Sequence, residues 1–391
     1  MNIGFMLVQT WRKVNIVDVG YCAMSACGNK GSGEQVKVMA ENIRMDSHKL
    51  IYHPDTVARW LKGENIYPIE VEISPSGACN HRCVFCAVDY IGYEPNFLDR
   101  DIILRDIGHM HKKGLKSVVC SGEGEPLLNK NLPDIVNGIK ALGVDVAMST
   151  NGVLFTKERL EECLGAFTWV RYSVASMEEK SYRKIQRGKE GDLQKVKENL
   201  LEAVRIKKDK KIRTTIGVQC LLLPDNEEYI VDMAKELKKI GVNYLTIKPY
   251  SQHLHSANQF AVDYNGFIEL EEELKTYATK DFSIYFRANA MQKMHQEKTY
   301  TQCLGLPFMA HIDAKGNVWP CVAHIGTEEL CYGNIYEQAF EDIWEGEKRQ
   351  EVVRKLNELN INKMCREACR LDEINKFLVE LKNPGEHVNF I

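Results

Sequence analysis

Residues 71–90 have the sequence VEISPSGACNHRCVFCAVDY, in which a short apolar run leads into three closely spaced cysteines. These are Cys79, Cys83 and Cys86, with the spacing C-x3-C-x2-C. A cubane iron–sulfur cluster needs one ligand for each iron, so three thiolates from one loop can hold three irons and leave the fourth open. Zinc loops instead pair two C-x2-C motifs, and no further His or Cys follows closely here. The spacing therefore favours a [4Fe–4S] cluster with one open iron, and the alternative is a thiolate zinc site.

The residues around this loop alternate between strand-like and helix-like patterns. Strands are expected at 68–74, 117–121, 144–149, 169–175, 213–223 and 244–249. Helical patterns lie between them at 101–113, 131–142, 156–164, 192–208 and 226–240. Strands that alternate with helices of this length form βαβ units, and hence a parallel sheet. The cysteine loop follows the first strand, which places it at the carboxyl edge of the sheet, where α/β folds hold their active sites.

The composition excludes several classes of protein. The chain of 391 residues has 51 basic and 54 acidic residues, so its formal charge of −3 offers no polyanion-binding surface, and we expect no nucleic-acid partner. No apolar run reaches the ~18 residues of a membrane span, and the first residues lack the pattern of a secretory signal. Thirteen cysteines without an export signal favour metal or redox chemistry over disulfides. We therefore expect a cytoplasmic protein with no membrane partner.

The C-x3-C-x2-C motif, with Phe85 directly before its third cysteine, resembles the signature of radical S-adenosylmethionine (SAM) enzymes. In that family SAM chelates the open iron through its amine and carboxylate groups, and an electron from the cluster cleaves it to a 5′-deoxyadenosyl radical. The resemblance implies that Cys79, Cys83 and Cys86 bind the cluster, and that an external reductant such as flavodoxin or ferredoxin supplies the electron. It also implies an α/β fold with a TIM-like partial (β/α)6 barrel over residues 66–250.

Two βα turns and two strands resemble the family's SAM-contacting motifs. The run SGEGEP, residues 121–126, resembles a Gly-Gly-Glu-Pro motif, but Glu123 stands where the first glycine usually lies. The residues that the resemblance assigns to SAM binding are Phe85, Gly122, Gly124, Glu125, Asn151, Ser173 and Gln219. Ordinary glycine-rich turns and packed strand ends are the alternative explanation of the same residues. Arg187 and Lys248 could meet the SAM carboxylate, although a lone cation is more often solvated.

A second set of cysteines lies in the C-terminal part of the chain. Between Cys303 and Cys321, alternating apolar residues flank Lys-Gly-Asn at 315–317, which predicts a β-hairpin that brings the two thiols together. Cys365 and Cys369 are four residues apart in a helical pattern, which predicts that both thiols lie on one helical face. These four thiolates are expected to converge, either on a second cluster or on a zinc ion.

The spacing C-x12-G-x4-C that begins at Cys303, together with GNIYEQAFEDIW at 333–344, resembles the auxiliary-cluster modules called SPASM and twitch. A full SPASM module holds two clusters and needs seven or eight cysteines, whereas this region has five. The resemblance therefore implies the shorter twitch version, a small α+β domain within residues 251–391 that holds one auxiliary [4Fe–4S] cluster. The implied ligands are Cys303, Cys321, Cys365 and Cys369. Cys331 is predicted to be a buried core cysteine, and the alternative is a fifth ligand candidate or a catalytic hydrogen-atom donor.

Residues 1–65 are expected to form a leader and a helical extension ahead of the barrel. Cys22 and Cys27 lie there in a stretch containing Gly and Ser that is typical of a loop, and a mobile leader is favoured over a metal site. His253 and His255 follow the last barrel strand, where they could contact a substrate, although surface histidines are equally common.

The resemblance covers residues 66–385 and implies SAM cleavage followed by hydrogen abstraction, but no motif indicates the step after it. We expect an oxidoreductase or epimerase acting on a small carbohydrate-like or nucleotide-sugar substrate, because relatives with a single auxiliary cluster commonly modify such molecules. Molybdenum-cofactor GTP cyclases resemble the barrel, but their C-terminal cysteine triplet and Gly-Gly tail are absent from this chain, which ends in HVNFI. The first alternative is a peptide-modifying maturase. The alternative from another class is a non-catalytic iron–sulfur or zinc protein.

Overall fold

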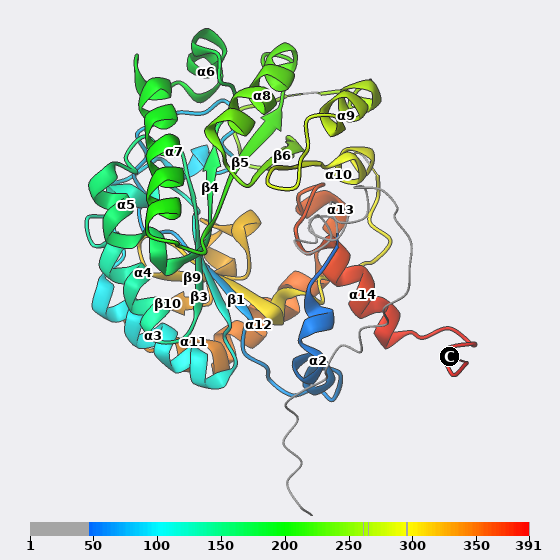
Figure 1. Cartoon of the computed structure of the whole chain (residues 1–391). Helices are drawn as coiled ribbons and strands as arrows, with labels where there is room; N and C mark the ends of the chain where they lie inside the picture. Colours follow the sequence, from blue (N-terminus) through cyan, green and yellow to red (C-terminus); the bar gives the residue numbers. More distant parts are fainter. Residues whose placement is uncertain (1–46, 261, 265, 295, 391) are drawn as a thin grey trace, which may run out of the picture.

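The computed structural model of the protein describes residues 47–260, 262–264, 266–294 and 296–390 (Figure 1). Within them, one ten-stranded sheet has the order β10-β9-β8-β1-β2-β3-β4-β5-β6-β7. Strands β1 to β6 are parallel and follow one another across the sheet in sequence order, as consecutive βαβ units do. The leader with Cys22 and Cys27 lies outside the described residues.

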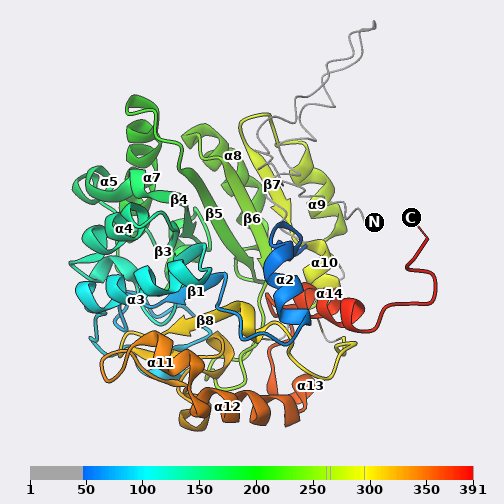
Figure 2. The same cartoon turned by 90° about the horizontal axis from the view of Figure 1, so that it is seen from below.

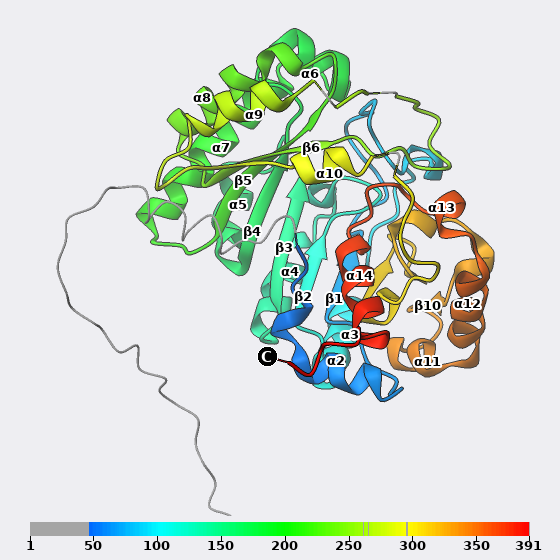
Figure 3. The ribbon, with the colours of Figure 1, turned by 90° about the vertical axis from the view of Figure 1, so that its right-hand side faces the viewer.

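The six central strands confirm the predicted pattern to within a few residues. They are β1 (Glu70–Ile73), β2 (Ser117–Cys120), β3 (Asp145–Thr150), β4 (Phe167–Ser173), β5 (Thr215–Leu222) and β6 (Tyr244–Pro249). The helices between them are α3 (Arg100–Lys113), α4 (Leu132–Ala141), α5 (Lys157–Cys163), α6 (Glu179–Gln186), α7 (Asp192–Asp209) and α8 (Ile230–Ile240). Helix α6 is the one in this group that the sequence pattern does not predict. The helices cover one side of the sheet (Figures 1 and 3), which makes this part of the chain the predicted partial barrel.

Helix α3 shows how local sequence positions one of these helices. Asp99 caps its N-terminus, because one carboxylate oxygen accepts hydrogen bonds from two backbone N–H groups of the first helical turn. Ile103, Ile107 and Met110 recur at helical spacing and are fully buried, so they form one apolar face within the barrel core.

Elements from the C-terminal part of the chain extend the sheet at both edges. Strand β7 (Ser283–Phe286) pairs in parallel with β6, while β8 (Met309–Ile312) pairs in parallel with β1. Beyond β8, strands β9 (Asn317–Trp319) and β10 (Gly333–Asn334) add antiparallel pairs. The sheet therefore crosses the expected domain boundary at residue 250 on both sides, and that boundary stays a prediction.

Strands β8 and β9 confirm the predicted hairpin. Asp313 organises the turn, because one carboxylate oxygen accepts hydrogen bonds from two turn N–H groups and the other accepts from the indole N–H of Trp319 at 2.7 Å. Gly316 has φ +83°, and a Cβ there would lie 2.4 Å from the ring of Tyr336. Only glycine fits that position without moving its neighbours.

The other helices lie outside the βαβ units. They are α2 (Pro54–Leu61), α9 (Ile268–Lys275), α10 (Ala288–Gln292), α11 (Phe340–Glu345), α12 (Glu347–Glu358), α13 (Ile361–Met364) and α14 (Asp372–Lys382). Helices α2 and α14 lie side by side (Figures 1 and 2), and a small apolar cluster that contains Val57, Phe308 and Leu378 joins them. Among the described residues, no helix combines the length and the apolarity that crossing a bilayer requires.

The predicted helix through Cys365 and Cys369 is wrong. Helix α13 ends before these residues and α14 begins after them, so both cysteines lie in the connecting loop. The N–H group of Ala368 donates to Ser251 Oγ at 3.3 Å, and the Arg366 guanidinium donates to the Ser251 carbonyl at 3.1 Å. These bonds to the loop after β6 hold the segment in an irregular shape, because tertiary contacts outweigh a weak local helix preference.

Candidate active site

The first three cysteines lie in the loop that follows β1, as their position in the sequence predicts. The N–H group of Cys86 donates to the Cys83 carbonyl at 3.1 Å, which closes a turn between the second and third cysteines. The loop is pinned to α6, because the N–H group of Val84 donates to the Ile185 carbonyl at 2.9 Å. All three thiol-bearing side chains are half-buried. The barrel therefore holds this loop against its helical layer.

The three thiols lie within one another's electrostatic field. Burial is the largest cause that raises the pKa of Cys79 to about 12, and the Glu125 carboxylate and the Cys86 thiol raise it further. Burial and the two neighbouring thiols hold the pKa of Cys83 well above its ordinary value. Thiolates crowded in this way need a compensating positive centre, which the irons of a cluster supply. These residues therefore fit the cubane cluster that their spacing predicts.

Residues beside the cysteines complete the loop, and sequence reasoning did not select them. Tyr93 has a left-handed φ of +57°, and its hydroxyl hydrogen-bonds with Cys86. The Arg82 guanidinium lies 4.1 Å from the centre of the Tyr93 ring. His81 is buried, and its Nε2 lies 3.4 Å from the Asp192 carboxylate at the start of α7. Their position within or next to the motif is the one signal that could have indicated them.

The turn SGEGEP approaches the cysteine loop closely. A Cβ on Gly124 would lie 2.1 Å from the carbonyl oxygen of Ala78, and the N–H group of Glu125 donates to this same carbonyl at 2.8 Å. Gly122 has φ +104°, and a Cβ there would lie 2.0 Å from Ser74 Oγ. Backbone contacts inside the site therefore require both glycines, whatever contact they also make with SAM.

Glu125 joins this turn to the loop after β3. Its carboxylate accepts hydrogen bonds from the Thr150 hydroxyl at 2.6 Å and from the Asn151 N–H group at 2.7 Å. Burial is the largest cause that raises its pKa to about 7, against the lowering effect of these bonds. The Asn151 side chain in turn donates to Asn80 Oδ1 at 2.7 Å, next to the first cysteine. The structure thus brings Glu125 and Asn151 together with the cysteine loop in one polar network.

Glu123, which departs from the family's glycine pattern, connects two parts of the sheet. Its side chain is buried, and Oε2 accepts a hydrogen bond at 2.7 Å from the N–H group of Ala314 in the turn between β8 and β9. Burial and the nearby Asp313 carboxylate raise its pKa to about 7. A glycine could not make this bond, so the substitution ties the turn after β2 to the C-terminal hairpin.

Ser173 and Gln219 lie opposite each other in neighbouring strands, near the carboxyl ends of β4 and β5. Both are half-buried, and their side chains hydrogen-bond to no other group in the described part of the chain. Phe85 lines the cavity that also holds the second set of cysteines, whereas Arg187 ends α6 and does not line it. The SAM contacts of these residues stay predictions.

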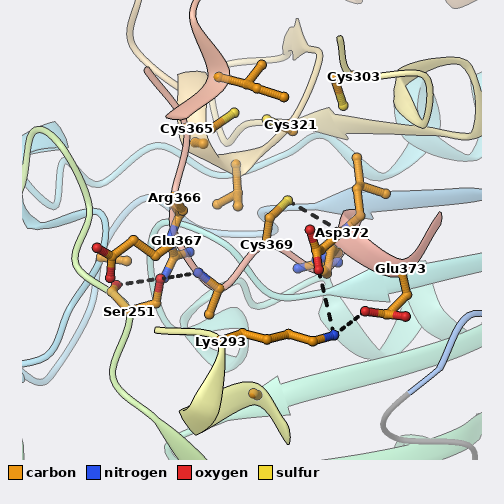
Figure 4. A pocket seen from close by; sticks show the side chains of 18 of the residues that line it. Ser251, Lys293, Cys303, Cys321, Cys365, Arg366, Glu367, Cys369, Asp372 and Glu373 are labelled. Atoms are coloured by element: carbon orange, nitrogen blue, oxygen red, sulfur yellow. Dashed lines mark hydrogen bonds and ion pairs between the residues drawn. The ribbon is translucent and has the colours of Figure 1, made fainter. Parts of the chain in front are cut away.

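The four C-terminal cysteines line one cavity (Figure 4), and the volume of this cavity is about 540 Å³. Cys303 precedes β8, Cys321 follows β9, and Cys365 and Cys369 come from the loop between α13 and α14. The structure therefore brings together the four thiols that were expected to converge, although two of them come from a loop and not from a helix. Their role as cluster ligands stays a prediction.

The surroundings of these thiols fit an iron–sulfur cluster. The Asn375 side chain donates to Cys303 Sγ at 3.4 Å and the Leu371 N–H group donates to Cys369 Sγ at 3.4 Å, and such N–H···S contacts tune iron–sulfur clusters. Burial and the neighbouring thiols hold the pKa of Cys321 well above its ordinary value. In the described part of the chain, no three His, Cys, Asp or Glu side chains close on a point as one metal ion requires. The N–H···S contacts and the crowding of the thiols therefore suit an iron–sulfur cluster.

Cys331 lies apart from this cavity. Its thiol donates to the Gly333 carbonyl at 3.4 Å beside β10, and it is not one of the residues that line the cavity. The hydrogen-donor hypothesis for Cys331 stays a prediction that gains no support from this position.

The loop after β6 lies between the first cysteine loop and the C-terminal part of the chain. The Tyr90 ring stacks on His253 with ring centres 5.0 Å apart, and the Tyr90 hydroxyl donates to the Ile325 carbonyl at 2.8 Å. His253 is buried in this contact, while His255 is exposed. Neither histidine lines the cavity, so the structure places them in a structural contact beside it.

Comparison with protein families decides what kind of site this is. A model of the radical SAM superfamily matches residues 73–237, and a model of the SPASM iron–sulfur cluster-binding domain matches residues 303–370. This chain is a radical SAM enzyme with a SPASM domain. The two domains imply a SAM-binding [4Fe–4S] cluster and an auxiliary cluster, as predicted, and favour iron–sulfur chemistry over zinc at both cysteine sets. The shorter twitch form of the module stays a prediction.

Known proteins similar to this radical SAM enzyme have different activities. The tungsten-containing aldehyde ferredoxin oxidoreductase cofactor-modifying protein of Pyrococcus furiosus is 23% identical over 295 residues, which cover 69% of this chain and 79% of that protein. A probable GTP 3′,8-cyclase of Methanococcus maripaludis is 25% identical over 234 residues, which cover 58% of this chain and 72% of the cyclase. The structure of Streptococcus suis SuiB bound to S-adenosylmethionine has a TM-score of 0.61 at 16% identity, covering 90% of this chain and 84% of SuiB. At that identity, the likeness shows the fold alone.

Proposed function

We propose that this radical SAM enzyme is an oxidoreductase that abstracts hydrogen from a small carbohydrate-like or nucleotide-sugar substrate. One observation carries the proposal: a single cavity is lined by Phe85 and Ala87 of the cysteine loop and by all four SPASM cysteines. A substrate in this cavity would lie beside the radical SAM loop and the SPASM thiols at once. The arrangement therefore supports a reaction that uses both the SAM-binding cluster and the auxiliary cluster.

The residues of the barrel have separate tasks in this proposal. Cys79, Cys83 and Cys86 would hold the SAM-binding cluster, and Ser173 and Gln219 would contact SAM from the strand ends. When bound, the cluster and SAM together supply one-electron cleavage of SAM and the power to abstract hydrogen from an unactivated C–H bond. The buried polar network keeps the loops around them in place, which preorganises the site. A flavodoxin or ferredoxin in the cytoplasm would be the reductant.

The cavity favours dehydrogenation over epimerisation. Epimerisation needs a hydrogen donor beside the substrate, and Cys331, the candidate donor, does not line the cavity. Dehydrogenation needs an acceptor for a second electron, and the cysteines that would hold the auxiliary cluster do line it. We therefore infer that the product carries a new carbonyl group.

Anaerobically reconstituted enzyme, reduced in the presence of SAM, tests the proposal. We expect 5′-deoxyadenosine from the wild type and none from the C79A/C83A/C86A variant, whose iron content should fall from about eight to about four per chain. With sugar phosphates and nucleotide sugars as candidate substrates, one deoxyadenosine formed per ketone or aldehyde supports dehydrogenation. A product that is inverted at one carbon and carries solvent deuterium there would establish epimerisation instead.

Peptide modification is the alternative function within the same superfamily. It rests on fold likeness alone, since SuiB, which is also known in complex with the precursor peptide SuiA, is 15% identical to this chain. Turnover of a peptide, with no turnover of any carbohydrate, would replace our proposal.

A further inference from the structure

Lys248 is a cation on the cavity wall that has no counter-ion among the residues that the structure describes. It lies near the end of β6, in register with Leu221 of β5, and it is half-buried among the residues that line the cavity. In the described part of the chain, its ammonium group makes no hydrogen bond and no ion pair. Enclosing a charge in protein costs free energy unless the charge is paired. An unpaired lysine in this position therefore indicates a partner that enters the cavity.

Arginine side chains lie on the same wall. The Arg366 guanidinium donates one N–H to the Ser251 carbonyl at 3.1 Å (Figure 4), and its Nε has no partner among the described residues. Arg370 is already paired, because its guanidinium lies 2.6 Å from the Glu72 carboxylate. Lys248 and Arg366 thus have no carboxylate partner in the part of the chain that the structure describes.

The neighbours of Lys248 make its positive charge costly. Burial is the largest cause that holds its pKa well below the ordinary value, and the guanidinium groups of Arg171, Arg366 and Arg370 lower the pKa further. Because each of these neighbours is a cation, the part of the wall around Lys248 repels a positive charge and attracts a negative one, whereas the Asp372 and Glu373 carboxylates of the same cavity are paired with Lys293. A bound anion would remove this repulsion and favour the ammonium form.

The cysteine thiols do not account for Lys248, and the residues assigned to SAM lie on other strands or in the loops that follow them. Arg366 lies in the field of the Cys369 and Cys321 thiols, so a cluster there could balance part of its charge. The strongest electrostatic influences on Lys248 are guanidinium groups and include no thiol. The turns assigned to SAM follow β2 and β3, and β3 is three strands away from β6 in the sheet. Gln219, the SAM-assigned residue nearest in the sheet, lies on the neighbouring strand β5 in register with Thr246, whereas Lys248 is in register with Leu221.

We propose that Lys248 and Arg366 bind a phosphoryl group of the substrate. The inference rests on the proposed function and deepens it, because it assigns a sugar phosphate or a nucleotide sugar to the cavity. Two cations without carboxylate partners match the two negative charges of a phosphate monoester or a diphosphate, whereas one carboxylate would leave a cation unpaired. Lysine as a point charge and arginine as a forked donor are both common phosphate ligands.

Binding of inorganic phosphate and inorganic pyrophosphate to the holoenzyme tests this site without turnover. Calorimetric titrations are made anaerobically at low salt, with and without saturating SAM. We expect Lys248→Met to weaken binding by at least ~10-fold and Lys248→Arg to bind within about threefold of the wild type. Lys238→Met, the same change on the exposed face of α8, is the matched control and should bind like the wild type. Iron content and thermal unfolding confirm that each variant is folded.

The outcomes separate this inference from the proposed function. Equal binding to wild-type and Lys248→Met enzyme would overturn the phosphoryl site, even if SAM is cleaved. Phosphate binding that depends on Lys248, in an enzyme that forms no deoxyadenosine, would instead overturn the proposed function alone. Loss of phosphate binding when SAM is added would assign Lys248 to the SAM carboxylate and overturn the inference.

The choice of anion identifies the substrate more closely. Tighter binding of pyrophosphate than of phosphate would support a nucleotide sugar, and the reverse order would support a sugar phosphate. Malonate bound as tightly as phosphate would replace the phosphoryl group with carboxylates, and would therefore overturn the assignment.

Discussion

The two sets of cysteines are built in opposite ways. The barrel set lies within one loop, from Cys79 to Cys86, whereas the SPASM set combines Cys303, Cys321 and the loop between α13 and α14. In a single loop, the spacing of the cysteines along the sequence already determines how the three ligands are arranged. The dispersed set depends on a hairpin, a shared sheet and contacts with the barrel. The difference teaches that the ligand spacing of the first site is set locally, while that of the second depends on the whole fold.

Removing one cysteine from each set should give the largest effects. Cys83→Ala should abolish 5′-deoxyadenosine formation, because it removes a ligand of the SAM-binding cluster. Cys321→Ala should leave SAM cleavage measurable but remove the oxidised product. Each variant should lose about half of about eight irons, as measured by iron analysis. Cys331→Ala, outside the cavity, is the matched control and should keep its iron.

The claimed difference between the two sites would be wrong if Cys321→Ala stopped deoxyadenosine formation as completely as Cys83→Ala does. The two sites would then form one cooperative unit, in which losing the dispersed cluster also unfolds the local one.

Replacing one glycine by alanine in each region tests the difference between the two cysteine sites through the backbone. Gly124→Ala would place a Cβ 2.1 Å from the Ala78 carbonyl oxygen, so the cysteine loop must shift. We expect at least ~10-fold slower deoxyadenosine formation, since small displacements in an active site have large effects. Gly316→Ala, at φ +83°, should disturb the SPASM hairpin and leave that rate within about twofold. Gly266→Ala, which faces open space, is the control, and equal rates for all three variants would contradict the prediction.

The raised pKa of Glu125, which lies in the barrel site, predicts that the stability of the protein depends on pH. Burial raises its pKa from 4.5 to about 7, so the folded protein keeps this proton to a higher pH than the unfolded chain does. The free energy of unfolding should therefore fall as pH rises from about 4.5 to about 7. Glu125→Gln cannot ionise, and relative to it the wild type should lose about 3 kcal/mol across that window. Urea denaturation of both proteins at several pH values measures this, and parallel curves would refute it.

The smallest effect should come from a residue that organises neither site. Asp99→Ala removes the cap of α3 and should lower the free energy of unfolding by about 1 kcal/mol, measured as a shift of the urea midpoint. Iron content and deoxyadenosine formation should stay unchanged. A loss of iron in this variant would show that α3 helps to position one of the cysteine sets.

Local patterns in the sequence predicted the barrel well. Strands β1 to β6 and their long helices follow apolar periodicities that a short window of sequence already contains. Helix α6 was missed because its eight residues are largely polar, with Tyr182 and Ile185 as its buried apolar side chains. The three-cysteine motif was equally local, and it indicated the radical SAM domain without any knowledge of the fold.

Contacts between distant parts of the chain account for what the sequence did not predict. The bond between Glu123 and Ala314 spans 191 residues, and the bond between Arg366 and Ser251 spans 115. No local pattern contains such pairs, so the purpose of Glu123 and the loop around Cys365 could not be predicted. For the same reason Lys248 remained a lone cation in the sequence, and its arginine neighbours emerge only from the fold.

Strand β8 protects one side of β1, whose backbone would otherwise be an open edge. The N–H group of Ile69 donates to the Phe308 carbonyl at 2.9 Å, and that of Ser74 donates to the Ile312 carbonyl at 2.8 Å. A truncated chain that stopped before Cys303 would leave these donors free to recruit a strand of another molecule, which is how exposed edges start aggregation. The radical SAM and SPASM domains are separate families. Producing either one alone would nevertheless expose a sheet edge that the other domain covers in this chain.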